Sequence, residues 1–501
     1  MNNKSKLFAI GLSLGLISCT TNQLQLNNDS SKQVIKKTPQ IIAQEQLFSA
    51  NYGNLLSSEY ITNYSLDTIK NNAVQNLCMG MNQDSKICQQ NLTNLNHDFA
   101  FDLKSIKNNK LGVTSVNVYN ITYDTLNMIP ANNHNYQVKT VSGSIFVPHG
   151  IHANKIKGVI LYYHPTMYNP YDYSPENNPK TGLFYPAMYA SQGYIVVLPD
   201  LLGFGVDANE AHPYMYPKVN VAAGINMLRA TNNLLTKLAL SPSNKLPLIL
   251  NGFSEGGMLS QWASYLIQNN TASLTNTNTK LALTLPMSGA FDLSDSQIKK
   301  EYANESVQQH NTYLAQNQYV TALAKPGLVA YAVNSYNYYT KTSCQQILQA
   351  SLCNFVNESG QNLKLMDLFL PSAPSTLAIQ DIIYNRATKA TQYAEYNNSI
   401  ANIVLPDNQL SLDYLQTYHA IDLKDWQTQS PILYLHLDRD SLVTPFNSLV
   451  AYKNVSKRSK SGLVSISAIH NDRYQEHNAQ IDHNNPIMYA ATVGILNKFF
   501  P

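Results

Sequence analysis

The residues with the clearest capacity for chemistry lie in the segment 252–257, which reads Gly-Phe-Ser-Glu-Gly-Gly. Its first five residues match the pattern Gly-x-Ser-x-Gly, in which a serine occupies a sharp turn between a strand and a helix. The flanking residues are glycines because the chain approaches itself closely at such a turn. An apolar stretch at 246–250 precedes the motif and a helical pattern at 258–267 follows it. We therefore predict that Ser254 is an exposed nucleophile.

A serine hydroxyl is a weak nucleophile unless a base removes its proton, and the base needs an acidic group to orient it. In enzymes that use this turn, the acid follows the serine in the chain and a histidine comes last. We predict that Asp440 is the acid, because it follows the apolar stretch 431–437 and lies before Val443. Asp438 is the alternative, and Asp292, after the preceding apolar stretch, is a third candidate.

Three histidines follow the last predicted strand and are candidates for the base: His470, His477 and His483. We prefer His483, because it lies in the loop directly before the C-terminal helical stretch at 486–499. His477 is the closest competitor, whereas His470 directly ends the strand, where a packing role is the alternative. The spacing lacks the HExxH pattern of zinc enzymes, so we predict neither a metal nor another cofactor.

The same chemistry requires two hydrogen-bond donors for the developing oxyanion. One predicted donor is the backbone N–H of Glu255, at the N-terminus of a helix, where free amide groups favour negative charge. The second should come from the loop after the strand at 158–163, which reads His-Pro-Thr-Met. Pro165 has no N–H, so Thr166 is the predicted donor and Met167 is the next candidate.

The apolar pattern of the chain predicts the elements that would hold these residues. Stretches 115–123 and 136–147 alternate between apolar and polar residues, as half-buried strands do. Continuous apolar runs, which are typical of parallel strands buried on both faces, alternate with helical stretches, and this alternation predicts an α/β domain. The runs lie at 158–163, 194–198, 246–250, 281–285, 432–435 and 463–466, and the helical stretches at 184–192, 218–240, 256–268 and 486–499.

The long insert between the strands at 281–285 and 432–435 is too long for a bare loop. We therefore predict a largely helical cap before the strand that carries the acid. The predicted organisation has six segments: a lipoprotein signal peptide (1–18), a polar tether (19–45), an N-terminal extension (46–111), the first part of the core (112–295), the cap (296–428) and the second part of the core (429–501).

The N-terminus carries the pattern of an export signal. Lys4 and Lys6 precede an apolar stretch at 7–17 that is too short to cross a bilayer comfortably. The stretch ends before Cys19 in a pattern that resembles a bacterial lipobox. Cleavage there and acylation of Cys19 would anchor the protein to a membrane, because each buried methylene contributes about 0.8 kcal/mol. The alternative is a plain signal peptide; either way we expect export to a bacterial cell envelope, at the periplasmic face or the outer membrane.

Four further cysteines form two pairs that are local in sequence, Cys78 with Cys88 and Cys344 with Cys353. Export exposes the chain to an oxidising compartment, so we predict two disulfides, with buried free thiols as the alternative. Metal binding is disfavoured, because neither pair has a CxxC spacing or an adjacent histidine. The net charge of +3 includes no long basic run, so we expect no nucleic-acid partner.

Taken together, these motifs resemble the secretory-lipase-like branch of the α/β-hydrolase superfamily, over residues 112–300 and 428–500. The most specific part is the stretch 193–205, followed by His-Pro-Tyr at 212–214. The segment 252–257 matches the family's serine turn with its additional glycine. The chain departs from the family at 164–165, where it has His-Pro and the family usually has His-Gly.

The resemblance implies an α/β-hydrolase fold, with a mostly parallel central sheet flanked by helices and a cap. It also implies a serine hydrolase that cleaves carboxylic esters through an acyl-enzyme. The tyrosine-rich cap suits an aromatic, small-molecule or lipid ester. A peptidase or an acyltransferase on the same fold is the first alternative, and a non-catalytic surface lipoprotein that binds ligands is the second.

Overall fold

The structure is a computed structural model, and the residues that it describes all lie in the larger of its two units, residues 40–501. The predicted signal peptide, Cys19, the tether and His477 lie outside the part of the chain that it describes. The described residues are 46–78, 85–108, 110–168, 184–294, 319–347, 353–356, 362–364, 369, 421–438, 440, 442–470, 483 and 486–501.

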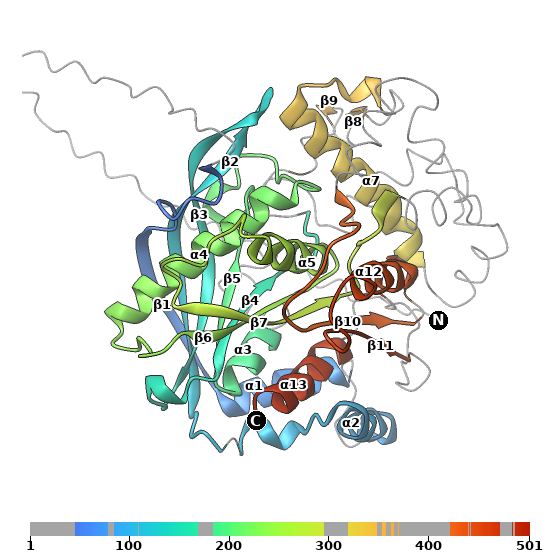
Figure 1. Cartoon of the computed structure of the whole chain (residues 1–501). Coiled ribbons are helices and arrows are strands. Elements are labelled where there is room, and N and C mark those ends of the chain that lie inside the picture. The colour runs from blue at the N-terminus through green and yellow to red at the C-terminus, as the bar shows by residue number, and fades with distance from the viewer. Residues whose placement is uncertain are drawn as a thin grey trace, which may run out of the picture. The chain divides into compact units, whose positions relative to one another are not determined.

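A nine-stranded sheet lies at the centre of the larger unit (Figure 1). Its strands are ordered β1-β2-β3-β5-β4-β6-β7-β10-β11. They are β1 (Leu55–Ser65), β2 (Ser115–Ile129), β3 (Asn132–His149), β4 (Gly158–Tyr163), β5 (Tyr194–Pro199), β6 (Leu246–Phe253), β7 (Thr279–Met287), β10 (Ile432–Leu437) and β11 (Val464–Ile469).

The direction of the strands changes across the sheet. The pairs β1–β2, β2–β3 and β3–β5 are antiparallel. All further pairs, from β5–β4 through β10–β11, are parallel. The carboxyl ends of the parallel strands therefore share one edge, where β6 ends at Phe253 and β10 ends at Leu437. The predicted mostly parallel sheet is confirmed.

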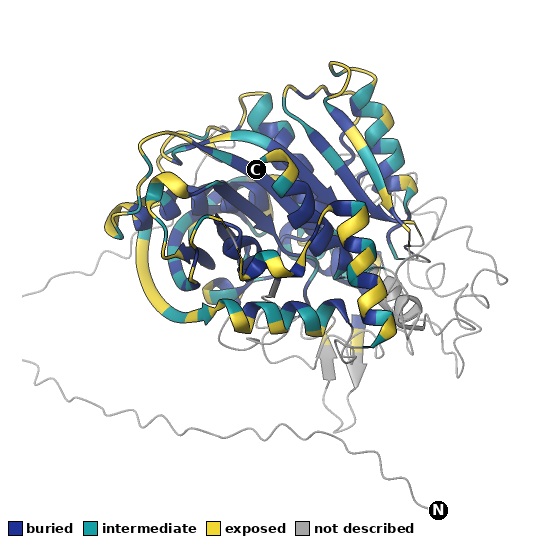
Figure 2. Ribbon diagram, turned by 90° about the horizontal axis from the view of Figure 1, so that it is seen from below, coloured by how far each residue is buried: buried dark blue, intermediate teal, exposed yellow. Residues whose placement is uncertain are grey.

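Residues of β4 alternate between two hydrophobic clusters, as the two-residue period of a strand requires. Val159, Leu161 and Tyr163 belong to one cluster, while Ile160 and Tyr162 belong to the other. Because all of these residues are buried, helices must cover both faces of the sheet. Figure 2 shows the buried strands between helices whose outer residues are exposed.

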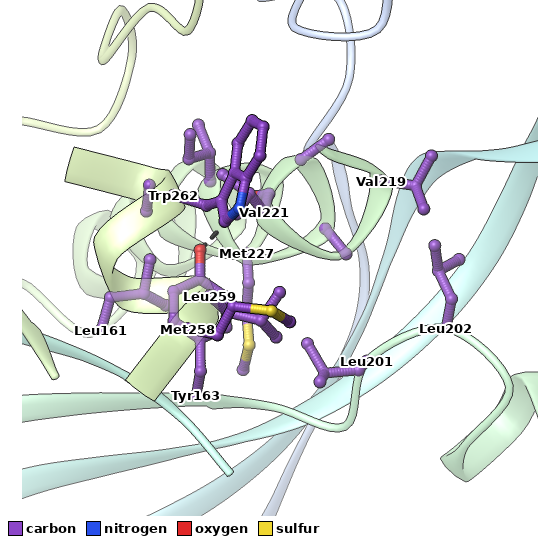
Figure 3. Packing of buried hydrophobic residues seen from close by; sticks show 14 of the residues in the cluster. Leu161, Tyr163, Leu201, Leu202, Val219, Val221, Met227, Met258, Leu259 and Trp262 are labelled. Carbon is purple, nitrogen blue, oxygen red and sulfur yellow. Dashed lines mark hydrogen bonds between the residues drawn. The ribbon is translucent and has the colours of Figure 1, made fainter. Parts of the chain in front are cut away.

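Helices α4 (Pro217–Lys237), α5 (Glu255–Gln268) and α12 (Phe446–Ser456) contribute buried residues to the first cluster. Helices α1 (Leu66–Leu77), α2 (Lys86–Phe99), α3 (Phe184–Ser191) and α13 (Ile487–Phe499) contribute to the second. In Figure 3, Met258, Leu259 and Trp262 of α5 lie over Leu161 and Tyr163 of the sheet. This packing fixes the helix that follows Ser254.

The insert between β7 and β10 is described in part. It contains the helix α7 (Tyr319–Thr340) and the short strands β8 (Asn354–Val356) and β9 (Asn362–Lys364), which pair antiparallel. Disulfides join Cys344 to Cys353 here and Cys78 to Cys88 after α1, as predicted. Within the described ranges, no helix is long and apolar enough to cross a membrane.

Two elements differ from the sequence-based expectation. Strand β1, in the predicted N-terminal extension, pairs with β2 at the edge of the sheet. It was not predicted as a strand, because most of its side chains are exposed and show no apolar period. Helix α12 was not predicted, because two of its buried positions are the polar residues Asn447 and Ser448. In addition, β11 ends at Ile469, three residues beyond the predicted 463–466.

Candidate active site

Ser254 occupies the turn between β6 and α5 with φ 58° and ψ −118°. This left-handed conformation is rare for a residue with a side chain, and strain of this kind is typical of functional turns. A Cβ at Gly252 would overlap the carbonyl oxygen of Gly256, and a Cβ at Gly256 would overlap that of Tyr163. The two glycines therefore allow the sharp turn that the sequence pattern predicted.

The side chains of Ser254, His483 and Asp440 lie in hydrogen-bond contact. The distance from His483 Nε2 to Ser254 Oγ is 2.9 Å, and that from His483 Nδ1 to Asp440 Oδ2 is 2.7 Å. Because the carboxylate can only accept, Nδ1–H donates to Asp440 and Nε2 is left to accept from the serine hydroxyl. The ring of Phe253 lies 4.9 Å from that of His483 and supports it.

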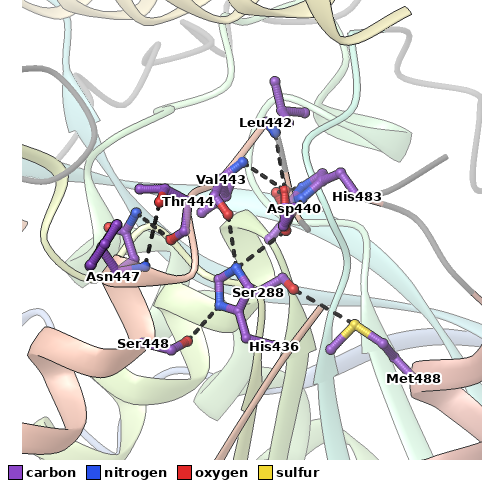
Figure 4. A network of polar contacts seen from close by, with 12 residues as sticks. Ser288, His436, Asp440, Leu442, Val443, Thr444, Asn447, Ser448, His483 and Met488 are labelled. Atoms are coloured by element: carbon purple, nitrogen blue, oxygen red, sulfur yellow. Dashed lines mark hydrogen bonds and ion pairs between the residues drawn. The ribbon is translucent and has the colours of Figure 1, made fainter. Parts of the chain in front are cut away.

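The carboxyl group of Asp440 is completely buried and has four neighbours (Figure 4). Its Oδ1 accepts from the backbone N–H groups of Leu442 at 3.1 Å and Val443 at 2.8 Å. Its Oδ2 faces His483 and, at 3.3 Å, Nε2 of His436. Burial alone raises the pKa of Asp440, but the adjacent histidines outweigh burial and lower it from 3.8 to about 2.

His436, on β10, is a site residue that the sequence reasoning missed. Its Nε2 lies 2.8 Å from the carbonyl oxygen of Val443 and 3.3 Å from Asp440 Oδ2, so Nε2 carries the hydrogen. Its Nδ1 lies 2.6 Å from Oγ of Ser448, on α12, which donates to it. A histidine in an otherwise apolar strand, four residues before the predicted acid, was the available signal.

The alternative acids and bases lie elsewhere. Asp438 pairs with His470 at 2.8 Å, and the His470 side chain is 67% exposed. Asp292 lies near Lys424 at 3.6 Å, and its backbone N–H donates to Asn447. The structure therefore brings His483 to Ser254 and Asp440 to His483, whereas Asp438, His470 and Asp292 lie outside this chain of contacts.

The two predicted oxyanion donors belong to segments that pack against each other, the start of α5 and the loop after β4. Glu255 is the first residue of α5, whose N-terminus packs against the end of β4, because Gly256 abuts the carbonyl groups of Tyr163 and His164. Thr166 follows in the loop from β4, and its Oγ1 lies 3.1 Å from Oη of Tyr214. Both backbone N–H groups thus belong to segments that meet beside the serine turn.

His164 fixes the start of this loop. Its ring nitrogens lie 2.7 Å from the carbonyl oxygen of Pro165 and 3.0 Å from that of Asp200. Burial lowers the pKa of His164, although both carbonyl contacts act in the opposite direction. Among the residues that the structure describes, no group of three or more His, Cys, Asp or Glu side chains is arranged to hold a metal ion.

Comparisons with known proteins give a structural likeness alone. No protein-family model and no curated protein matches the chain. The rice cell wall degrading esterase LipA from Xanthomonas oryzae matches with a TM-score of 0.60 and 19% identity, over 89% of this chain and 97% of that one. A candidate hydrolase from Legionella pneumophila matches with a TM-score of 0.60 and 18% identity, over 89% and 98%.

Lipase A from Candida antarctica matches more distantly, with a TM-score of 0.43 and 12% identity, over 83% of this chain and 76% of the lipase. The first two structures match over nearly the whole of their own length, at identities that show a shared fold. The chain has the α/β-hydrolase fold, as the sequence motifs predicted.

Proposed function

We propose that the chain is a serine-dependent hydrolase of carboxylic esters. The observation that carries this proposal is the continuous contact from Ser254 Oγ through His483 to Asp440, at 2.9 and 2.7 Å. A nucleophile, a base and an orienting acid within hydrogen-bond reach are the requirement for acyl transfer. Binding alone would not require all three.

The geometry supports a two-step mechanism. Ser254 Oγ attacks the ester carbonyl while His483 Nε2 takes its proton, and Asp440 stabilises the imidazolium that forms. The backbone N–H groups of Glu255 and Thr166 stabilise the oxyanion of the tetrahedral intermediate. His483 then protonates the departing alcohol, which leaves an acyl-enzyme. Water, deprotonated by His483, attacks the acyl-enzyme, and the carboxylic acid departs as Ser254 recovers its proton.

An aromatic cluster beside the proposed oxyanion loop supports an apolar or aromatic substrate. Tyr168, two residues after Thr166, lies 5.1 Å from Tyr331 of α7 and 5.7 Å from Phe369, between ring centroids. These three rings are buried in the structure, and we propose that they form the apolar wall against which an acyl chain or an aryl group of the substrate would lie. LipA, to which the fold is similar, is a rice cell wall degrading esterase, and this likeness supports an ester as the substrate.

A Ser254→Ala variant tests the proposal with p-nitrophenyl butyrate and octanoate. We expect kcat/KM to fall by about 10⁴-fold or more, because both the nucleophile and the acyl-enzyme are lost. Ser260→Ala is a matched control on the same helix, since the Ser260 hydroxyl donates to the carbonyl oxygen of Gly257 at 2.8 Å and lies outside the contacts of Ser254, His483 and Asp440. Unchanged hydrolysis by Ser254→Ala would overturn the proposal, and faster turnover of amides or alcohol acceptors would redirect it to a peptidase or an acyltransferase.

We also propose that the protein is exported and anchored through lipid on Cys19. The disulfides Cys78–Cys88 and Cys344–Cys353 support an oxidising compartment. Cells grown with a labelled fatty acid should incorporate the label into the wild-type protein and not into Cys19→Ala. Equal labelling of both proteins, or none in either, would contradict the anchor.

A further inference from the structure

The segment 211–214 contacts both residues proposed as oxyanion donors. His212 Nε2 lies 2.8 Å from the side-chain Oε1 of Glu255. Tyr214 Oη lies 3.1 Å from Oγ1 of Thr166. Two residues in one short segment thus hold the side chains of the two residues whose backbone N–H groups would stabilise the oxyanion.

The same segment is held by one face of helix α7, which belongs to the insert. Tyr339 Oη donates to the carbonyl oxygen of Ala211 at 2.7 Å, and Ser335 Oγ donates to that of Tyr214 at 3.1 Å. The Tyr331 ring lies 4.8 Å from the Tyr214 ring. Tyr331, Ser335 and Tyr339 are four residues apart, so they lie on one face of the helix.

The segment 211–214 is also held by the loop after β5, which contacts His212. His212 Nδ1–H donates to the carbonyl oxygen of Leu202 at 2.7 Å, and the Phe204 ring lies 4.7 Å from the His212 ring. Gly203 has φ +80°, and a Cβ there would overlap the backbone of His212. The side chains of His212 and Glu255 are each only 1% exposed, so water cannot replace a lost partner, and loss of one partner is costly.

We infer that His212 and Tyr214 are positioning residues that connect the docked helix α7 to the oxyanion hole. The inference rests on the proposed function. Donor groups must be held to within about 0.5 Å to stabilise an oxyanion, and the segment 211–214 supplies that support from the insert. Full activity therefore requires α7 to be packed on this segment, and loosening α7 slows the chemical step without weakening ester binding.

The first test uses Tyr214→Phe, which removes the contact with Thr166 and keeps the ring. We expect kcat for p-nitrophenyl butyrate to fall about tenfold with KM changed less than twofold, because the lost support acts in the transition state. Ser335→Ala lies in the insert and does not touch Thr166; it should lower kcat in the same direction by about threefold. Tyr338→Phe, adjacent on α7 but outside this face, should leave both constants unchanged.

A second measurement separates positioning from a general structural role. Ser254 Oγ adds to the carbonyl carbon of a trifluoromethyl ketone analogue, and the resulting adduct carries an oxyanion. The corresponding secondary alcohol has no carbonyl group and cannot form this adduct. In Tyr214→Phe, the inhibition constant of the ketone should rise by the same factor by which kcat/KM falls, and that of the alcohol should stay constant. A structural role would weaken both inhibitors or neither.

A double-mutant cycle between Tyr214→Phe and Thr166→Val tests the route of the effect. If Tyr214 acts through Thr166, the double variant loses no more than the larger single loss, because both changes remove one contact. Three results would overturn the inference. The losses in kcat of the two single variants could multiply in the double variant, or Tyr214→Phe could change KM without changing kcat. Tyr338→Phe could also lose as much activity as Tyr214→Phe. Failure of the proposed function is distinct, since then Ser254→Ala would keep the wild-type rate.

Discussion

At the scale of single residues, Asp440 explains how a buried acid stays ionised beside the proposed base. A carboxylate has about four acceptor positions, and two backbone N–H groups and two imidazoles face this one. The two histidines outweigh burial and lower the pKa of Asp440 to about 2, so the carboxyl group is charged near neutral pH. The charged carboxylate accepts a hydrogen bond from Nδ1–H of His483 and so orients its ring toward Ser254.

His436 should matter to catalysis although it does not touch Ser254. His436→Leu removes the donor to Asp440 Oδ2 and the acceptor for Ser448, and we expect kcat/KM to fall about 10- to 100-fold, as a lost bond to a charged group predicts. His436→Gln keeps an N–H donor and should lose far less. Steady-state kinetics on both variants decide this, and equal losses would show that ring packing, and not the donor, is what counts.

The sequence predicted Ser254, Asp440 and His483, which the structure brings together. The sequence evidence for these three residues differed in strength. Ser254 was predictable because its motif has a steric cause, the close approach at Gly252 and Gly256. His483 was chosen only from its place before a helix, and its role stays a prediction supported by distance. His436 could not be chosen, because one sequence does not say which acid a buried strand histidine faces.

At the scale of elements, the turn from β6 into α5 depends on the space at Gly256. Gly256→Ala would press a methyl group into the carbonyl oxygen of Tyr163, and we expect it to lower stability by roughly 3 kcal/mol and to abolish most activity. Gly462→Ala is the control: it has φ +84° with no atom within 4 Å, so backbone strain of roughly 1 kcal/mol is its only cost. Urea unfolding measures both, and similar midpoints for the two variants would contradict the steric account.

The parallel strands were predictable because short, continuous apolar runs are typical of strands that are buried on both faces. β4 and β5 are buried at every position, so no polar residue obscures them. β1 and α12 were not predictable for the opposite reason. β1 is mostly exposed at the edge of the sheet, and α12 buries the polar residues Asn447 and Ser448 against polar partners. Neither element therefore has the apolar period on which sequence-based prediction depends.

At the scale of the whole molecule, the insert between β7 and β10 is the part whose role differs most between sequence and structure. Its presence was predictable from length, but its contact with the segment 211–214 was not. Tyr331, Ser335 and Tyr339 follow a helical spacing that is equally consistent with ordinary core packing. Only the fold brings that face to the segment beside the serine turn.

The stability of the molecule should depend on pH through Asp207. Burial raises the pKa of Asp207 from 3.8 to about 6, against a hydrogen bond from the Gly203 N–H at 3.0 Å. The folded state therefore binds the proton more tightly than the unfolded state, and the contribution of Asp207 to stability is present below about pH 4 and lost as the pH rises through 6. A rise from 3.8 to about 6 corresponds to about 3 kcal/mol.

Asp207→Asn keeps an acceptor oxygen without the charge. Its free energy of unfolding should match that of the wild type at pH 4 and exceed it by up to about 3 kcal/mol at pH 7. Chemical unfolding at pH 4, 5, 6 and 7 measures the difference. A constant difference across this range, or a variant less stable at pH 7, would contradict the buried-acid account.

The central claim, that Ser254 is a nucleophile activated by His483, is tested most directly by covalent labelling. The folded protein is treated with a fluorophosphonate, and the adduct is located and timed by mass spectrometry of peptides. We predict one adduct, on Ser254, which forms at least about 100-fold more slowly in His483→Ala and at the wild-type rate in His470→Ala. No adduct on Ser254 of the folded protein, or a wild-type labelling rate in His483→Ala, would contradict the claim.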